Sequence, residues 1–263
     1  MPTVDLEAAR IHYRFDGDDS ASTLVLVNSL GTDHSMWDKV APAFARRYRV
    51  LRYDMRGHGL SGVPPGPYTL AELAGDLIRL LDHLKIARAH LCGLSLGGMV
   101  GAWIAIHRPE RVGRLILANT DARIGSPEMW NERIAGIRRA GMAPLADATM
   151  ARWFTPQFRA EHPAEIEPLR ALLENCPAEG YIGCCAALRD ADLRAGLSSI
   201  SSRCLILAGE FDPATPAANA RILHSAIRNS SFVELPCSHL SAWERPEEFQ
   251  QAALDFLREQ EVS

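Results

Sequence analysis

The sequence has no long hydrophobic run, no basic stripe and no paired-cysteine motif, and each absence excludes a class of protein. Without about 20 consecutive apolar residues, no transmembrane helix is expected. Residues 1–5 lack the basic-then-apolar start of a signal peptide, so we expect a cytoplasmic protein. The 28 Lys and Arg stand against 32 Asp and Glu, a net charge of −4. We therefore expect neither a nucleic-acid nor a membrane partner.

The cysteines are scattered without C-x-x-C spacing, and most of them lie in apolar runs. This pattern is typical of small buried residues, so we expect reduced thiols and no metal site. With 263 residues and 47% hydrophobic content, the chain is long enough to bury a full core. Its size fits one large α/β domain, with or without an insertion.

Short continuous apolar runs recur along the chain with helical segments between them. Such runs are typical of strands that are covered on both faces. They occupy residues 23–27, 48–53, 89–92, 114–118, 203–208 and 231–235. Residues 68–84 carry leucines at a helical period, and the alternating residues 4–13 predict an antiparallel pair at one edge. The pattern predicts a mostly parallel sheet wrapped by helices.

This alternation stops between residues 124 and 196, where no strand is predicted. Helical segments follow one another there, over residues 127–140, 145–154, 164–175 and 177–190. We interpret 124–196 as an all-helical cap inserted into a core of residues 1–123 and 197–263. A cap closes over the carboxyl edge of the strands, where ligands of open α/β sheets bind.

The pentapeptide 93–97, Gly-Leu-Ser-Leu-Gly, is a G-x-S-x-G motif between a predicted strand and a predicted helix. In that context the motif predicts a nucleophile elbow. The serine of such an elbow has a strained backbone, and side chains at the flanking glycines would crowd the turn. Ser95 is therefore the candidate nucleophile. On its own the motif also occurs by chance as a turn of small residues.

A serine hydroxyl needs a general base, itself oriented by an acid, and in this architecture the acid and then the histidine follow the serine. His239 lies in a loop just past the last predicted strand, so we choose it as the base. We choose Asp212, which follows the strand at 203–208, as the acid. Asp121 remains an alternative, because some relatives of this architecture place the acid one strand earlier, and Glu210, two residues before Asp212, is a second alternative.

The oxyanion hole of this architecture uses the backbone N–H after the nucleophile and one from the loop after the third strand. These positions are Leu96 and, in the loop Asn28-Ser-Leu-Gly-Thr32, Leu30. A second motif, Asp54-x-Arg-Gly-His-Gly-x-Ser61, follows a strand as a glycine-rich turn. We interpret it as a structural loop that braces the active-site edge, with His58 outside the catalytic set.

Taken together, these motifs resemble those of α/β-hydrolase-fold serine hydrolases, and the resemblance spans nearly the whole chain. The fold that it implies is a mostly parallel eight-stranded sheet with an inserted helical cap. The 28–32 loop, residues 118–125 and the cap start 130–133 resemble 3-oxoadipate enol-lactonase more narrowly. That family hydrolyses 3-oxoadipate enol-lactone to 3-oxoadipate in the bacterial catabolism of aromatic compounds. Within residues 118–125, Asp121 differs from the residue that is typical of that family.

The resemblance implies a small-molecule lactone substrate, attacked at its ring carbonyl by Ser95 with no metal or organic cofactor. The substrate keeps a free carboxylate, so a basic side chain is expected in the pocket. On the first cap helix, Arg133 and Arg138 flank the apolar stripe of Trp130, Ile134 and Ile137. We expect Trp130, and Trp153 from the next helix, to pack against the lactone ring of the substrate. One of the two arginines would bind the carboxylate, unless both lie at the cap surface.

Other classes stay open at this point. A cofactor-free perhydrolase or haloperoxidase shares the triad, but it usually has Pro or an aromatic residue where Leu30 stands. An aliphatic dehalogenase would carry Asp at Ser95. A non-catalytic ligand receptor on this fold generally loses the serine or the histidine, and both are present here. Another small-ester hydrolase is the remaining alternative, and the sequence indicates no oligomeric state.

Overall fold

The computed structural model describes residues 2–258, and eight strands in this part of the chain form one sheet. The ends of the predicted core, residues 1 and 259–263, lie outside the described residues. The strands are β1 (Thr3–Leu6), β2 (Ala9–Asp16), β3 (Thr23–Val27), β4 (Arg49–Tyr53), β5 (Ala89–Leu94), β6 (Val112–Ala118), β7 (Arg203–Gly209) and β8 (Ser230–Leu235). Their order in the sheet is β1-β2-β4-β3-β5-β6-β7-β8.

The sheet is parallel from β4 to β8, and its only antiparallel pairs among the described residues are β1 with β2 and β2 with β4. The central strands are buried along almost their whole length. Continuous Val, Leu and Ile runs suit this position, because helices cover both faces of each strand. Both the predicted parallel sheet and its antiparallel edge are confirmed.

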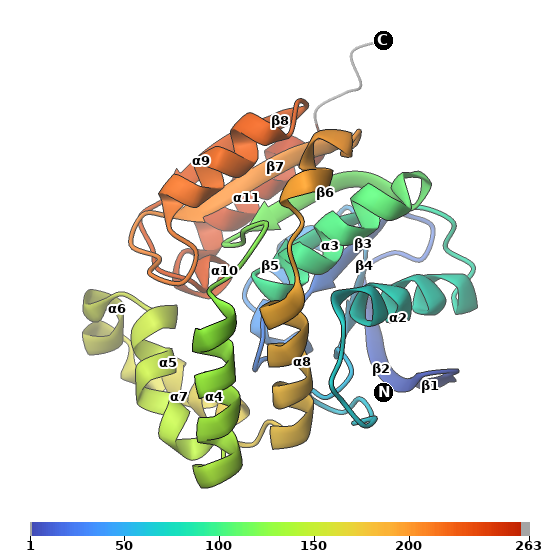
Figure 1. The fold of residues 1–263 in the computed structure, drawn as a ribbon. Coiled ribbons are helices and arrows are strands. Elements are labelled where there is room, and N and C mark those ends of the chain that lie inside the picture. Colours follow the sequence, from blue (N-terminus) through green and yellow to red (C-terminus); the bar gives the residue numbers. More distant parts are fainter. Residues whose placement is uncertain (1, 259–263) are drawn as a thin grey trace.

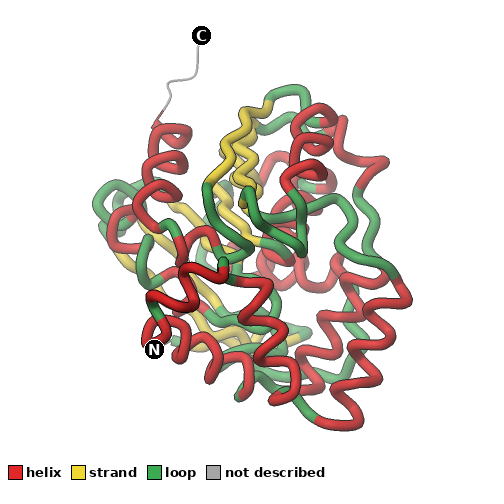
Figure 2. Tube along the Cα trace, turned by 90° about the vertical axis from the view of Figure 1, so that its left-hand side faces the viewer, coloured by secondary structure: helices red, strands yellow, loops and turns green. Residues whose placement is uncertain are grey.

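Helices lie on both faces of the sheet (Figures 1 and 2). One face is covered by α2 (Leu70–His83), α3 (Leu96–His107) and α9 (Ala217–Ala226), and the other by α1 (Ala41–Phe44), α10 (Ser241–Glu244) and α11 (Pro246–Arg258). The periodic leucines of residues 68–84 form the buried face of α2. This helix begins with a capping box, in which the side chains and backbone N–H groups of Thr69 and Glu72 bond reciprocally.

Five further helices lie between β6 and β7 and gather at one end of the sheet (Figure 1). They are α4 (Pro127–Ala140), α5 (Ala146–Trp153), α6 (Pro156–Glu161), α7 (Pro163–Glu174) and α8 (Ala178–Asp190). The sequence did not predict α6, which is only six residues long. We keep the division into a core and a cap of residues 124–196 as our proposal. Short 3₁₀ helices also occur between these elements, at His34–Trp37, Pro109–Arg111, Ala143–Leu145 and Arg194–Ser199.

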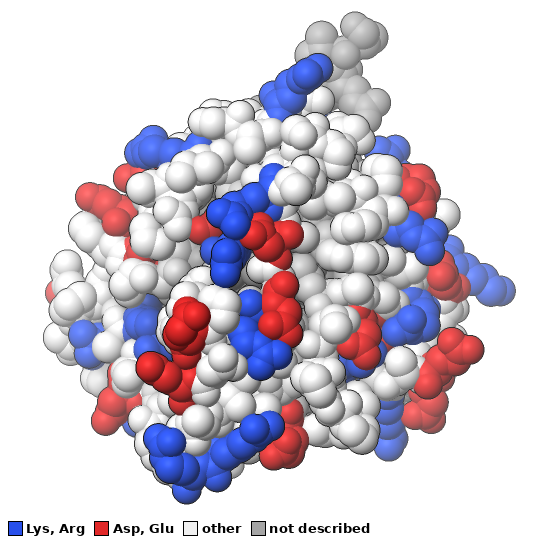
Figure 3. All heavy atoms as spheres, viewed as in Figure 1, with Lys and Arg blue, Asp and Glu red and all other residues white. Residues whose placement is uncertain are grey.

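The surface charges and the cysteines are distributed as the composition led us to expect. Basic and acidic side chains are interspersed on the face shown in Figure 3, with no large patch of one sign. No helix among residues 2–258 is long and apolar enough to cross a membrane. All six cysteines are buried and unpaired.

Candidate active site

Ser95 occupies the sharp turn between β5 and α3, with a φ of 58° and a ψ of −115°. Few non-glycine residues adopt such a conformation, and it requires neighbours that leave the backbone room. A Cβ added to Gly93 would lie 2.1 Å from the carbonyl oxygen of Gly97, and one added to Gly97 would lie 2.1 Å from that of Val27. Glycine is therefore required at both positions, and the turn has the geometry predicted for a nucleophile elbow.

The backbone of Ser95 is held on both sides. Its N–H donates to the carbonyl oxygen of Ala118 over 2.9 Å, and its own carbonyl oxygen accepts the hydroxyl of Thr120 over 2.7 Å. The Ser95 hydroxyl forms no hydrogen bond with another described residue. Ser95 and His239 line the same cavity, which residues of α4, α5 and α8 also line.

The structure brings His239 and Asp212 together. His239 Nδ1 lies 2.8 Å from Asp212 Oδ2, and both side chains are buried. Neither alternative acid reaches this ring. Asp121 instead accepts the backbone N–H of Ala122 and the side-chain amide of Asn219 on α9, and Glu210 is exposed at the end of β7.

Asp212 is held by more donors than the sequence predicted. Its Oδ1 accepts the backbone N–H groups of Ala214 and Thr215, over 2.8 and 3.1 Å. Its Oδ2 accepts the Thr215 hydroxyl over 2.7 Å and the Asn119 amide over 3.0 Å. Burial raises the pKa of Asp212, but His239 and these donors outweigh burial and bring the pKa below its ordinary value. The carboxylate is therefore ionised at neutral pH, as a partner for a protonated His239 must be.

Asn119 and Glu244 are further residues of the site that sequence reasoning missed. Asn119 has a φ of 43° and also donates to the carbonyl oxygen of Ser238. Glu244 is buried and accepts the backbone N–H of Ser238 over 2.9 Å, together with the hydroxyl of Thr155 at the start of α6. Asn119 directly follows the strand β6, and a polar residue at that position could have been recognised from the sequence as a candidate for the site. Nothing in the local sequence pointed to Glu244.

The two predicted oxyanion donors lie on adjoining segments. Leu96 is the first residue of α3, where an N–H group has no acceptor within the helix. Leu30 lies in the loop after β3, lines the cavity, and its N–H has no hydrogen-bond partner among the described residues. Gly97 packs directly against the backbone of Val27 and Asn28, so the elbow and this loop are in contact.

Helices α4, α5 and α8 supply the other walls of the cavity. Trp130 and Trp153 both line it, and the Trp130 indole N–H donates to the carbonyl oxygen of Ile124 over 2.7 Å. Arg133 also lines it, with its guanidinium carbon 4.9 Å from the centroid of the Trp130 ring. Arg138 does not. It is exposed and lines a separate groove between α4 and α8, so its prediction as a substrate ligand is corrected. Five residues further along α4, it points about 140° away from Arg133.

A second arginine in the cavity, Arg152 on α5, was not predicted. Its guanidinium donates to Thr149 Oγ1 over 2.9 Å. Burial lowers the pKa of Arg152, and the charge of Arg133 lowers it further, yet a guanidinium stays protonated at neutral pH. Among residues 2–258, no carboxylate forms an ion pair with Arg133 or Arg152. The site therefore holds two cationic groups that the protein itself does not neutralise.

Comparisons with known proteins agree with this geometry. The alpha/beta hydrolase fold family matches residues 22–246. The chain belongs to this family. It is 42% identical to 3-oxoadipate enol-lactonase 2 of Acinetobacter baylyi, over 95% of this chain and 94% of that protein, and 37% identical to 3-oxoadipate enol-lactonase 1 of the same organism, over 94% and 93%. Its structure superposes on the crystal structure of the enol-lactonase from Burkholderia xenovorans LB400 with a TM-score of 0.97 and 43% identity, covering 98% and 100% of the chains.

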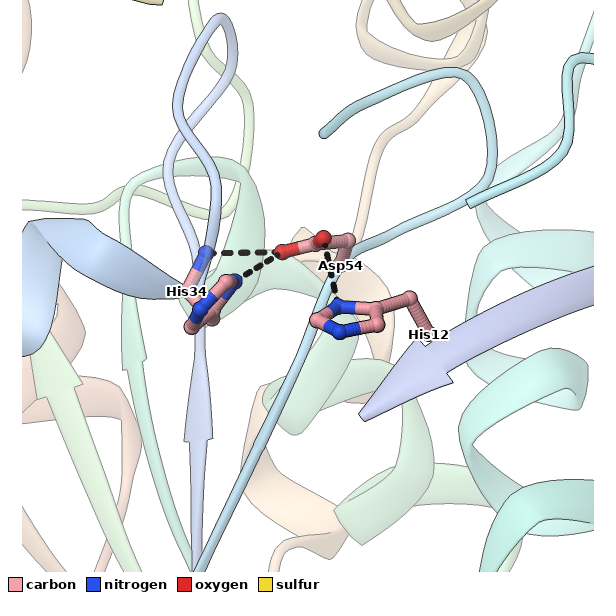
Figure 4. A group of neighbouring side chains, drawn as sticks. All are labelled: His12, His34 and Asp54. Atoms are coloured by element: carbon pink, nitrogen blue, oxygen red, sulfur yellow. Dashed lines mark hydrogen bonds and ion pairs between the residues drawn. The ribbon is translucent and has the colours of Figure 1, made fainter. Parts of the chain in front are cut away.

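One group of metal-type ligands occurs among the described residues of this α/β hydrolase, formed by His12, His34 and Asp54 (Figure 4). The Asp54 carboxylate lies between the two rings, 2.9 Å from Nδ1 of each. It also accepts the backbone N–H groups of His34 and Leu60, over 2.8 and 2.9 Å. The Asp54 carboxylate therefore accepts four hydrogen bonds. This arrangement is that of a structural link between the segments of His12, His34 and Leu60.

The motif of residues 54–61, which contains Asp54, is also bonded to α2. Arg56 binds the buried Asp76 of α2 through two parallel hydrogen bonds, one of them 2.7 Å long between Nη2 and Oδ1. Ser61 donates to the carbonyl oxygen of Asp54 over 2.6 Å and closes the turn. The motif is therefore a loop held by hydrogen bonds, and its role in bracing the active-site edge stays a prediction.

Proposed function

We propose that this enzyme hydrolyses 3-oxoadipate enol-lactone to 3-oxoadipate through an acyl-enzyme on Ser95. The two curated enol-lactonase relatives and the superposed enol-lactonase support the proposal, because each aligns over more than nine-tenths of this chain. This assignment makes the protein an ester-hydrolysing enzyme of bacterial aromatic catabolism. We keep the cytoplasm as its expected compartment and a small molecule as its expected partner.

In the proposed first step, Ser95 Oγ attacks the ring carbonyl carbon and His239 takes the hydroxyl proton. Asp212 binds Nδ1 of His239, which leaves Nε2 as the basic nitrogen. The N–H groups of Leu30 and Leu96 would stabilise the negative charge on the carbonyl oxygen. Each such donor in a dry pocket lowers an acyl-transfer barrier by about 3 kcal/mol.

Collapse of the tetrahedral intermediate breaks the ring C–O bond. The leaving oxygen belongs to an enol, so it departs more readily than an alkoxide, and it takes its proton from His239. The enol then tautomerises to the ketone, which draws the reaction forward. Water, deprotonated by His239, attacks the acyl-enzyme and releases the second carboxylate with Ser95 restored. Besides the substrate and water, these steps use only residues of this chain.

The observation that carries the choice of substrate is the pair of arginines beside the nucleophile. Two guanidinium groups without carboxylate partners in one cavity favour an anionic ligand, because the ligand then supplies the missing counter-charge. A neutral ester would leave both charges uncompensated. The substrate that we propose carries one carboxylate in addition to its lactone, and the aromatic walls of Trp130 and Trp153 suit its flat ring.

The test compares two substrates of similar size on the purified protein. We expect kcat/KM for the carboxylate-bearing enol-lactone to exceed that for a neutral p-nitrophenyl ester by at least about tenfold, since a charge-assisted hydrogen bond contributes about 1.5–3 kcal/mol. Ring opening and p-nitrophenol release are followed by absorbance. A preference for neutral esters would contradict the lactone assignment and leave a general esterase.

Replacing either cavity arginine should impair only the anionic substrate. We expect Arg133→Ala and Arg152→Ala each to raise KM for the lactone by about 10- to 100-fold, while KM for the neutral ester changes little. Arg138→Ala is the matched control, because that side chain lies in the other groove and should leave both constants unchanged. Equal effects on both substrates would show that the carboxylate is bound elsewhere.

A further inference from the structure

His58 contacts the loop that carries the predicted oxyanion donor Leu30. Its Nε2 accepts the backbone N–H of Gly31 over 3.0 Å, and Nδ1 lies 3.3 Å from the carbonyl oxygen of Arg56. The ring is 1% exposed. A backbone N–H can only donate, so Nε2 must present its lone pair. The proton is therefore on Nδ1, which donates to Arg56, and both ring nitrogens are used.

The two peptide groups on either side of Leu30 are each held by a hydrogen bond. The carbonyl oxygen of Ser29 accepts the Thr32 hydroxyl over 2.8 Å and the Thr32 N–H over 3.3 Å. In a trans peptide the N–H points opposite to the C=O, so these bonds direct the Leu30 N–H away from Thr32. The next peptide group, between Leu30 and Gly31, is held only at Gly31 N–H, by His58.

We propose that His58 is a positioning residue for the oxyanion hole. The Thr32 bonds hold the peptide group that carries the Leu30 N–H, and His58 holds the peptide group that follows it by accepting the Gly31 N–H, so that Leu30 is fixed on both sides. This inference rests on the proposed acyl transfer at Ser95. Gly31 has a φ of 80°, and glycine has the greatest freedom to rotate its peptide groups. Without an acceptor, the Leu30–Gly31 peptide would lose its defined orientation and its buried N–H would be left unpaired.

The cap holds His58 and the oxyanion loop in place from the other side. A Cβ on Gly57 would lie 2.5 Å from Cα of Gly180 on α8, so the two backbones are in direct contact. A Cβ on Gly31 would lie 2.7 Å from Leu173 of α7 and 3.0 Å from Tyr181 of α8. The turn at Gly31 therefore packs against α7 and α8 on this side and is bonded to His58 at its N–H.

The surroundings of His58 keep it neutral, as an acceptor must be. Burial lowers its pKa below the ordinary value, and this effect exceeds the opposing influence of the hydrogen bond to the Arg56 carbonyl oxygen and of the Asp54 and Asp33 charges. From α8, the Cys184 sulfur lies 4.0 Å from Nδ1, and the Tyr181 ring centroid lies 6.4 Å from that of His58. Burial also raises the pKa of Cys184, so its thiol is uncharged.

The test uses three variants that differ in what they present to Gly31. His58→Gln can place its amide oxygen where Nε2 lies, whereas His58→Phe fills the space without an acceptor, and His58→Asn is polar but too short. We expect the Phe and Asn variants to lower kcat by about 10- to 100-fold, with KM changed less than about threefold, since oxyanion donors act in the transition state. His58→Gln should keep kcat within about threefold of the wild type.

His90→Phe is the matched control. His90 Nδ1 also accepts a backbone N–H, that of Arg114 over 3.0 Å, but it lies near the start of β5, at the opposite end of the sheet from Ser95. This variant should lower Tm without lowering kcat. A wild-type kcat in folded His58→Phe or His58→Asn would overturn the inference. So would a His58→Gln variant as impaired as they are. Loss of the proposed function itself would show differently, as turnover that persists in Ser95→Ala.

Discussion

Replacing Ser95 or His239 by alanine is expected to lower kcat by about 10⁴-fold or more, and the double variant should be little worse than either single variant. The physical reason is that the two groups act in one step. Without His239 the Ser95 hydroxyl is a weak nucleophile, and without Ser95 the base has no proton to take. The measurement is kcat on the enol-lactone, with labelling of Ser95 by a fluorophosphonate as a direct assay of the nucleophile.

The acid of the triad is tested by comparing Asp212 with Asp121, the alternative carboxylate. Asp212→Asn removes the charge beside His239 and favours the wrong tautomer, so kcat should fall by about 10³- to 10⁴-fold. Asp121→Asn makes the same change in a group that binds Ala122 and Asn219, and it should change kcat less than about threefold. If the two variants proved equally damaging, Asp212 would not be the acid. Additive losses in the double variant of Ser95 and His239 would contradict their joint action.

Gly97→Ala should damage both stability and activity. Its new methyl group would lie 2.1 Å from the carbonyl oxygen of Val27 and 2.7 Å from that of Asn28. Both atoms belong to backbone and cannot rotate away, so either the elbow or the loop after β3 must shift. We expect the free energy of unfolding to fall by about 3 kcal/mol, which lowers Tm by roughly 10 °C in a domain of this size. The same shift would separate the two predicted oxyanion donors, so kcat should fall by about 100-fold.

Gly136→Ala is the same substitution in open space. A Cβ at Gly136, within α4, meets no atom within 4 Å, so alanine should raise the free energy of unfolding by about 0.5–1 kcal/mol through helix propensity. Thermal unfolding and kcat of the two variants are compared under the same conditions. A Gly97→Ala protein with wild-type Tm and kcat would show that the elbow tolerates a side chain and that its glycines are not required.

Local patterns in the chain were sufficient for the fold and for the elbow. Parallel strands buried on both faces need uninterrupted apolar residues, and the leucines of α2 show the period of a helix with one buried face. The strand-turn-helix context around Ser95 and the positions of Asp212 and His239 after later strands are also local features. Chain order is informative here because the carboxyl ends of parallel strands meet at one edge of the sheet. The short α6 escaped prediction because six residues carry too little periodicity.

The environment of the catalytic groups depended on tertiary contacts that no short segment contains. Asn119 and Asp212 are 93 residues apart in sequence, and His58 and Gly31 are 27 apart, yet each pair is joined by a single hydrogen bond. The position of a side chain beside the apolar stripe of a helix also does not predict which cavity it lines. Arg133 lines the active site while Arg138 faces a separate groove, and Arg152 joins Arg133 from another helix. Strand and helix periodicity are local, so the sequence was enough to place the catalytic residues at the edge of the sheet. Which of these residues contact one another, and in what electrostatic surroundings, could be seen only in the folded chain, because hydrogen bonds and burial depend on packing between elements that are distant in sequence.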